Sequence, residues 1–268
     1  MATTIITSNI KRRLSFNMKS IYSITHQIGV RLLLIFNHIL AVIGITYSSL
    51  WWYLCIPIGF ILFGKIGGEI GTHRYIAHGS FKTTKIKHYL LSTLGMFNCF
   101  GSPISWAIAH RAHHINSDDK LDPHSPHIIP WWKVWLTSWQ KVELQLKHYA
   151  DLLKDPIYKN CHKYYFAIIF TTFALLATID WRLPIFLICI PSCISLHGAC
   201  LINVVCHMWG YRNFDTPDKS TNNWWANDLT LGSGLHNNHH NDPSNWDENV
   251  TGKERDYCGW FIKNYLKI

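Results

Sequence analysis

The sequence has few charged residues, which make up 15% of its 268 residues, whereas hydrophobic residues make up 48% and Trp occurs 13 times. Its eight Cys form no C-x-x-C pair and mostly lie in apolar stretches, so neither a disulfide scaffold nor a zinc ribbon is indicated. No signal-peptide pattern is found at the start. No recognition module accompanies the net charge of +9, which argues against nucleic acid as a partner. We therefore expect a membrane protein with reduced, buried thiols.

Long apolar runs predict four membrane-spanning helices. They lie at 28–47, 50–70, 164–179 and 183–206. The short links after the first and third runs predict two hairpins. Lys11, Arg12 and Arg13 precede the first run, and every Lys and Arg except Arg182 then lies on the side of the termini or at its edge. The positive-inside rule identifies that side as cytosolic.

The expected fold class is therefore an all-α integral membrane protein, with a helical cytosolic cap formed by 71–163 and 207–268 and a single domain over 1–268. A fifth apolar stretch, Tyr89–Ala109, is expected to lie at the membrane interface, because Gly101-Ser102-Pro103 interrupts it and a crossing there would separate the His motifs. An aromatic group with two nearby Lys is expected at the interface or in the core of the cap: Trp131, Trp132, Trp135 and Trp139, with Lys133 and Lys141.

Glycines at three- and four-residue spacing in the second run predict close helix packing on the way to His73. They are Gly64, Gly67, Gly68 and Gly71. The second span is thus expected to continue beyond the membrane as a helix. The fourth run ends in Asn203 and His207, which lie one turn apart on one helical face.

Histidine is unusually abundant, and its spacing is that of metal ligands. Two H-x-x-H-H motifs comprise His110, His113 and His114 in the first and His236, His239 and His240 in the second. Independent placement of 17 His would produce about 0.07 copies of this motif in the chain, so two copies are not a coincidence. His73 and His78, five residues apart, gain meaning from the other six.

These His are too many for one metal ion and predict a centre with two metals. On a helix, positions i, i+3 and i+4 share a face, whereas His73 and His78 at i and i+5 diverge and could contact two different metals. A closed zinc site needs only four ligands and has no redox chemistry, whereas imidazole-rich sites with open positions suit iron. The Glu-x-x-His motif of carboxylate di-iron bundles does not occur.

The sequence resembles the membrane fatty-acid desaturases of the acyl-CoA or stearoyl-CoA Δ9 type, including bacterial acyl-lipid relatives. The resemblance starts near Gly64 and runs to the C-terminus. It is carried by GTHRYIAHGS from Gly71, WAIAHRAHHINSDDKLDPHSP from Trp106, NVVCHMWGYRNFD from Asn203 and NNWWANDLTLGSGLHNNHHNDPSNW from Asn222. It implies a four-span helical protein with a cytosolic cap over two iron ions.

The resemblance also implies how the ligands are shared, with no catalytic residue beyond the metal centre. One iron would take His73, His110, His114 and His239, with Asn203 bound through a water molecule. The other would take His78, His113, His207, His236 and His240. Asp118 and Asp122 follow the second motif, where they could be partners of the ring N–H groups or solvated turn residues.

The chain departs from the family pattern in three places. Ser233 stands where a Glu is expected before the last motif, which puts one contact to a ligand in doubt. Ala199 and Cys200 replace a Thr and a Trp that shape the acyl tunnel in relatives, so both are predicted tunnel residues together with Trp106. Ile108 and Ala109 replace an Arg and an Asp that lie near the CoA end in animal relatives. The carrier is therefore open among CoA, a lipid and acyl-carrier protein.

The expected function is O2-dependent desaturation, which introduces a cis double bond, by resemblance at Δ9, into a saturated acyl chain. An external electron donor, cytochrome b5 or ferredoxin with its reductase, is implied, because no H-P-G-G haem motif is present. The host membrane would be the bacterial inner membrane or the endoplasmic reticulum. Two alternatives remain: a membrane di-iron hydroxylase of alkanes, sterols or acyl chains, and a non-enzymatic metal-binding membrane protein. The latter would need polar groups along several spans, where only Asn37, His38 and His197 are evident.

Overall fold

The computed structural model describes residues 24–137, 142 and 144–268. Lys11, Arg12, Arg13, Trp139 and Lys141 lie outside the described residues. Within the described ranges every regular element is a helix, and β-type pairing is limited to two isolated bridges, Tyr211 with Asn222 and Asn222 with Leu235. The all-helical prediction is confirmed for this part of the chain.

The first half of the chain forms two long helical rods, α2 and the continuous helix of η1, α3 and η2, followed by shorter helices. In order, the elements are α2 (Ile24–Tyr47), η1 (Leu50–Leu54), α3 (Cys55–Gly59), η2 (Phe60–Ala77), α4 (Lys85–Leu94), η3 (Gly95–Asn98), α5 (Pro103–Asn116), η4 (Trp131–Lys133), α6 (Val134–Thr137) and η5 (Leu146–His148).

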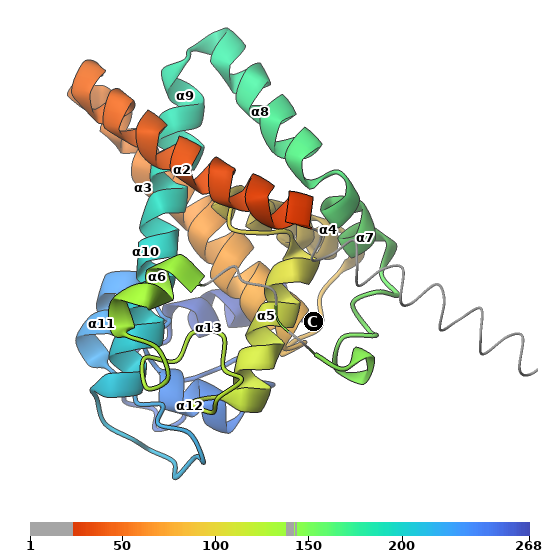
Figure 1. Ribbon diagram of the computed structural model, residues 1–268, viewed down its shortest axis with the longest axis vertical. Coiled ribbons are helices and arrows are strands. Elements are labelled where there is room, and N and C mark those ends of the chain that lie inside the picture. Colours follow the sequence, from red (N-terminus) through yellow and green to blue (C-terminus); the bar gives the residue numbers. More distant parts are fainter. Residues whose placement is uncertain (1–23, 138–141, 143) are drawn as a thin grey trace, which may run out of the picture.

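The second half contains a bent helix pair, one long rod and short helices near the C-terminus. In order, these are α7 (Pro156–Lys163), α8 (Tyr165–Ile179), α9 (Arg182–Pro184), η6 (Ile185–Cys189), α10 (Ile190–Met208), α11 (Trp224–Thr230), α12 (His236–Asn241), α13 (Tyr257–Phe261) and η7 (Ile262–Leu266). Figure 1 shows α2, α3, α8 and α9 in one half of the molecule and α11, α12 and α13 in the other, with α10 reaching from one half into the other.

Three continuous helices are long and apolar enough to cross a bilayer: His26–Tyr47, Leu50–Ala77 and Arg182–Met208. A fourth span arises if α7 and α8 count as one, although the two are bent by 67°. These helices fall on the predicted runs. The second rod continues to Ala77, so the predicted helical extension toward His73 is confirmed.

Close packing of the second rod depends on its glycines. A Cβ at Gly67 would lie 2.5 Å from the backbone carbon of Leu94, and a Cβ at Gly71 would lie 2.7 Å from the carbonyl oxygen of Leu91. Side chains at these positions would push α4 and η3 away from η2. The sequence prediction from glycine spacing is therefore confirmed, and these contacts fix the helix that carries His73.

The apolar stretch Tyr89–Ala109 is not one helix. The chain leaves η3 through Cys99, which has a φ of 64°, and Gly101, which has a φ of 126°, before Pro103 starts α5. Ser102 caps α5 by accepting a hydrogen bond from the backbone N–H of Ser105. The interruption predicted from Gly101-Ser102-Pro103 is confirmed, and it turns α5 so that its His motif can approach the second rod.

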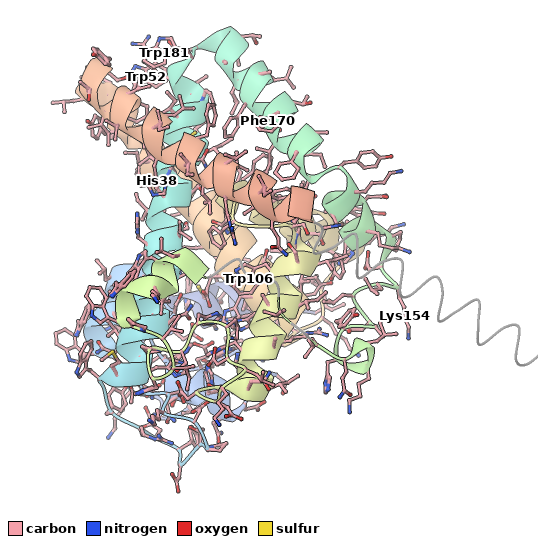
Figure 2. The ribbon with its side chains drawn as sticks, in the orientation of Figure 1. His38, Trp52, Trp106, Lys154, Phe170 and Trp181 are labelled. Carbon is pink, nitrogen blue, oxygen red and sulfur yellow. The ribbon has the colours of Figure 1, made fainter. Side chains whose placement is uncertain are left out.

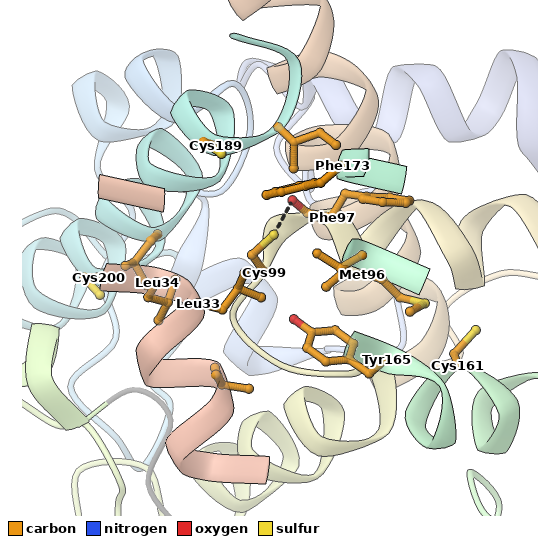
Figure 3. Close-up of a cluster of buried hydrophobic side chains, with 14 of the residues drawn as sticks. Leu33, Leu34, Met96, Phe97, Cys99, Cys161, Tyr165, Phe173, Cys189 and Cys200 are labelled. Atoms are coloured by element: carbon orange, nitrogen blue, oxygen red, sulfur yellow. Dashed lines mark hydrogen bonds between the residues drawn. The ribbon is translucent and has the colours of Figure 1, made fainter. Parts of the chain in front are cut away.

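The largest core cluster joins α2, η3, α8 and the continuous helix of α9, η6 and α10 (Arg182–Met208), called the α10 rod below. Figure 3 shows Leu33 of α2 next to Cys99 and Leu34 next to Cys200, and the Cys99 thiol donates to the Phe97 carbonyl oxygen at 3.3 Å. All eight Cys are free thiols, and all but Cys55 are buried. The prediction of buried thiols is thus confirmed for seven of the eight Cys.

Candidate metal centre

The motif His converge from four separate segments into two adjoining groups. In each group the candidate ligand atoms lie within 4.8 Å of one another. The first group is His73, His78, His110, His114 and His239; the second is His113, His207, His236 and His240. The groups adjoin where the rings of His114 and His240 stack, with centroids 4.3 Å apart. Helices α5 and α12 each contribute to both groups, as expected for H-x-x-H-H motifs that are shared between two metals.

His78 lies with the first group and not with the second, to which the resemblance would assign it. The reason is the hydrogen bonding of η2, which is of the π type. The N–H of His78 donates to the carbonyl oxygen of His73 at 3.2 Å, an i to i+5 bond. Such a turn brings positions i and i+5 together, so the two rings lie 5.1 Å apart instead of diverging.

Buried carboxylates orient several of the rings. His73 Nδ1 donates to Glu69 Oε1 at 2.7 Å, His113 Nδ1 to Asp122 at 3.0 Å and His207 Nδ1 to Asp118 Oδ2 at 2.9 Å. His240 Nδ1 donates to Asp218. Asp118 and Asp122 are therefore ring partners, one of the two roles that the sequence left open. A carboxylate on Nδ1 fixes the tautomer whose Nε2 carries a free lone pair.

The Nε2 atoms of the rings converge across the centre. The Nε2 atoms of His73 and His239 are 3.0 Å apart, and those of His207 and His236 are 3.1 Å apart. The buried Nε2 atoms of His113 and His240 have no hydrogen-bond partner. In their neutral form, His73, His113, His207 and His240 place their one ring proton on Nδ1, beside a carboxylate, so their Nε2 atoms can only accept. Converging acceptors beside buried carboxylates suit cations, so the residues fit two metal ions.

The protonation states agree with metal binding. Burial lowers the pKa of His110, His114, His236, His239 and His240 well below the ordinary value, and the neighbouring rings lower it further. Burial opposes ionisation of Asp122, but the hydrogen bond and charge of His113, together with the contacts of His124, outweigh it and lower the pKa of Asp122 to about 2. The pKa of Asp118 is also lowered by its bond with His207. Neutral imidazoles with ionised carboxylates are the form that binds metal.

These pKa directions predict that the metal-free protein loses stability in acid. Below pH 6.5 the His of the unfolded chain bind protons, while the same His in the folded chain stay neutral because their pKa values are depressed. Stability should fall progressively as the pH drops below 6.5. The Tm of chelator-treated protein in detergent should be lower at pH 5.5 than at pH 7.5. A Tm that is unchanged or higher at pH 5.5 would contradict this interpretation.

A buried cation ties the second rod to the C-terminal segment. The Arg74 guanidinium donates to both oxygens of Asp256, at 2.6 and 3.0 Å, and to the carbonyl oxygens of Trp246 and Gly232. Its Nη2 also lies 3.0 Å from Glu248 Oε2. Breaking a buried pair of this kind leaves an uncompensated charge, so this network holds His73 and the C-terminal segment in register.

Several site residues were missed by sequence reasoning. Glu69 precedes His73 by one helical turn, so its spacing could have identified it. Asp218 comes from a loop and has no such signal. Glu248 Oε1 lies 3.2 Å from His239 Nδ1 without hydrogen-bonding geometry, and burial raises the pKa of Glu248 well above its ordinary value.

Ser233, which stands where a Glu was expected, still takes part in a ligand contact. Its hydroxyl donates to Glu69 Oε2 at 2.7 Å and accepts from Lys65 Nζ at 3.1 Å. Glu69 uses its other oxygen for His73. A carboxylate from η2 therefore stands between Ser233 and His73.

A cavity of about 680 Å³ reaches the His groups from the candidate spanning helices. His73, His110, His236 and Asn203 line it near the centre, and Ala41, Ile45 and Phe60 line it in the spans. The predicted tunnel residues Trp106, Ala199 and Cys200 all line it. The Trp106 ring also stacks on His110, with centroids 4.7 Å apart. From Asn203 back to Ile190, the wall formed by α10 extends about 20 Å at 1.5 Å per residue.

Comparison with known proteins identifies the family. The model of the fatty acid desaturase family matches residues 48–245, well over half of the chain. The chain belongs to the fatty acid desaturase family. As a member it is an acyl desaturase, an oxidoreductase of lipid metabolism, and the resemblance drawn from its motifs is confirmed.

Three relatives illustrate the range of substrates within the family. An sn-1 stearoyl-lipid 9-desaturase of Anabaena variabilis is 33% identical over 76% of this chain and 77% of its own length. An sn-2 palmitoyl-lipid 9-desaturase of Nostoc sp. (strain 36) is 31% identical over 82% of both chains. An acyl-CoA C20 Delta5-desaturase of Anemone leveillei is 33% identical over 73% of this chain and 64% of its own length.

Proposed function

We propose that this desaturase uses two iron ions and O2 to introduce a cis double bond, at Δ9, into a saturated acyl chain. The observation that carries the proposal is the pair of His groups at the end of an apolar cavity. The names of the Anabaena variabilis and Nostoc relatives support Δ9. The His73, His113, His207 and His240 rings, each held by a carboxylate, would keep the irons at that end.

The chain's own residues would bind, orient and shield the substrate. When bound, the irons would supply the activation of O2 and the oxidation of two adjacent C–H bonds. A saturated chain offers no polar handle, so the cavity must hold it by apolar contact, with Trp106, Ala199 and Cys200 in the wall. Holding the target carbons beside His73, His110 and His236 turns an unreactive C–H bond into a positioned one. Asn203 would contribute to the centre through a water molecule.

The membrane topology that we infer depends on four candidate spans. With α7 and α8 taken as one crossing, the four candidate spans would pair into two hairpins, and the His motifs, both termini and the cap at 71–163 and 207–268 would share one side. The distribution of Lys and Arg supports a cytosolic location for that side. An external electron donor, cytochrome b5 or a ferredoxin with its reductase, would supply the two electrons of the reaction. The whole chain would act as one desaturase domain.

The experiment is expression in a desaturase-deficient host, followed by mass spectrometry of each lipid class. We expect monounsaturated chains with a cis bond at a single position. An inactive variant, His113→Ala, serves as the background control. Alcohols in place of alkenes would favour a hydroxylase, and the absence of both products from iron-loaded protein would refute the proposal.

A further inference from the structure

The cavity is not closed on its lipid side. Four of its lining side chains are exposed: Ile45 of α2, Ile194 and His197 of α10, and Leu229 of α11. Ile194, His197 and Leu201 follow one another at three- and four-residue spacing, so they form one face of α10. Both α2 and the α10 rod are candidate spans. An exposed cavity wall on such helices faces the bilayer.

A chain of hydrogen bonds links the three elements beside this opening. Trp135 Nε1 of α6 donates to His197 Nδ1 at 3.1 Å. The His197 Nε2 proton is then directed to His38 Nε2 of α2, 3.2 Å away. His38 Nδ1 in turn donates to the Leu34 carbonyl oxygen at 2.7 Å. Figure 2 labels His38 on α2, where that helix crosses in front of the α10 rod in this view.

Each of the four ring nitrogens of His38 and His197 has one partner in these hydrogen bonds, and the partners determine both tautomers. His197 accepts at Nδ1 and donates at Nε2, whereas His38 accepts at Nε2 and donates at Nδ1. Polar side chains within spans are costly and usually mark a functional path. This pair is distinct from the metal ligands, since His197 lies ten residues, about 15 Å along α10, from His207.

We propose that this opening admits the acyl chain of a membrane glycerolipid sideways from the bilayer, and that the Trp135–His197–His38 hydrogen bonds gate it. The proposal rests on the proposed function and names its substrate class. A glycerolipid chain already lies among the spans, so it can slide past Ile194 without leaving apolar surroundings. A chain carried by CoA ends in a large charged head that stays in water, so it would enter from the end of the cavity near the His groups and would not need this side route.

The route can be tested without iron or turnover. Protein in nanodiscs is given phosphatidylcholine with a diazirine midway along a stearoyl chain, irradiated and mapped by mass spectrometry. We expect adducts on the inner wall at Ala199 and Cys200. Ile194→Trp should reduce them to background by filling the opening. Leu175→Trp is the matched control, because Leu175 is exposed on α8 and lies outside the cavity.

Stearoyl-CoA with the same diazirine, added from water, distinguishes the two carriers. If it labels the inner wall, Ile194→Trp should leave that labelling intact; labelling by the lipid alone also supports the proposal. Undiminished lipid labelling in Ile194→Trp, equal loss with both probes, or no inner-wall adduct in the wild type would overturn it. If lipid labels the wall but iron-loaded protein forms no double bond, the proposed function fails while the route stands.

The gate has its own variant. Trp135→Phe keeps an aromatic side chain but removes the N–H that donates to His197, so labelling of the inner wall by phosphatidylcholine should become severalfold faster. Trp132→Phe is the control, since Trp132 is exposed and its ring contacts Lys133. Labelling in Trp135→Phe that is unchanged or slower than in the wild type would refute the gating role.

Discussion

Replacing His113 with Ala is expected to abolish metal binding in the second group and with it desaturation. His113 is almost fully buried, donates to Asp122 and has a bare Nε2 that no protein group satisfies. Its removal takes one of four ligand positions and leaves the Asp122 carboxylate without its donor. The loss of activity should exceed the roughly 100-fold upper range seen when only an outer partner of a ligand is removed. His110→Ala and His239→Ala should behave alike in the first group.

Metal content and product formation should be measured on the same membrane preparation. His148→Ala is the matched control, because His148 lies in η5 and belongs to neither His group. Membrane insertion should be unaffected, since the spans do not depend on the ligands. Wild-type turnover in any of the three ligand variants would remove the basis for the site.

Glu69→Gln is expected to have the second largest effect. The Glu69 carboxylate accepts from His73 Nδ1 with one oxygen and from Ser233 with the other. An amide of the same size can accept on one side only, so either the His73 ring or the Ser233 hydroxyl loses its acceptor. Loss of such a partner typically costs about 10- to 100-fold in metal affinity or activity.

Two comparisons separate orientation of the ligand from a general loss of stability. Ser233→Ala removes the contact on the far side of Glu69 but leaves the carboxylate on His73, so its effect should be smaller. Asp215→Asn changes a fully exposed carboxylate and should have none. Metal affinity equal to the wild type in Glu69→Gln would show that the contact to His73 does not support the centre.

The candidate metal ligands could be predicted because the spacing of the His residues determines which rings share a helical face. H-x-x-H-H places three rings on one helical face, and the structure brings both motifs together with His73, His78 and His207. Asp118 and Asp122 were found as candidates because they follow the second motif closely, and both contact a ring. The His residues of the site and two of their carboxylate partners could thus be predicted from the sequence alone.

Other features depend on contacts that no spacing encodes. The location of His78 depends on a π turn, whose i to i+5 bond reverses the divergence expected for an α-helix. Asp218 and Glu248 reach the rings from loops that are distant in sequence. The side opening of the cavity exists because α2, α6 and α10 meet there, which only tertiary packing shows.

The positions of the long helices were predicted better than the bends within them. The apolar runs located the first, second and fourth rods, and Gly101-Ser102-Pro103 located the break before α5. The 67° bend between α7 and α8 was not foreseen, because Tyr164 gives no breaker signal of the Gly or Pro type. The third predicted span is therefore a bent pair of helices, whereas the other three candidate spans are continuous.

The most direct test is the anomalous diffraction of iron in crystals of the iron-loaded protein. The account predicts two peaks per chain, one among His73, His78, His110, His114 and His239 and one among His113, His207, His236 and His240. A single peak, or a peak at the nearby group His113, Asp122 and His124, would contradict it.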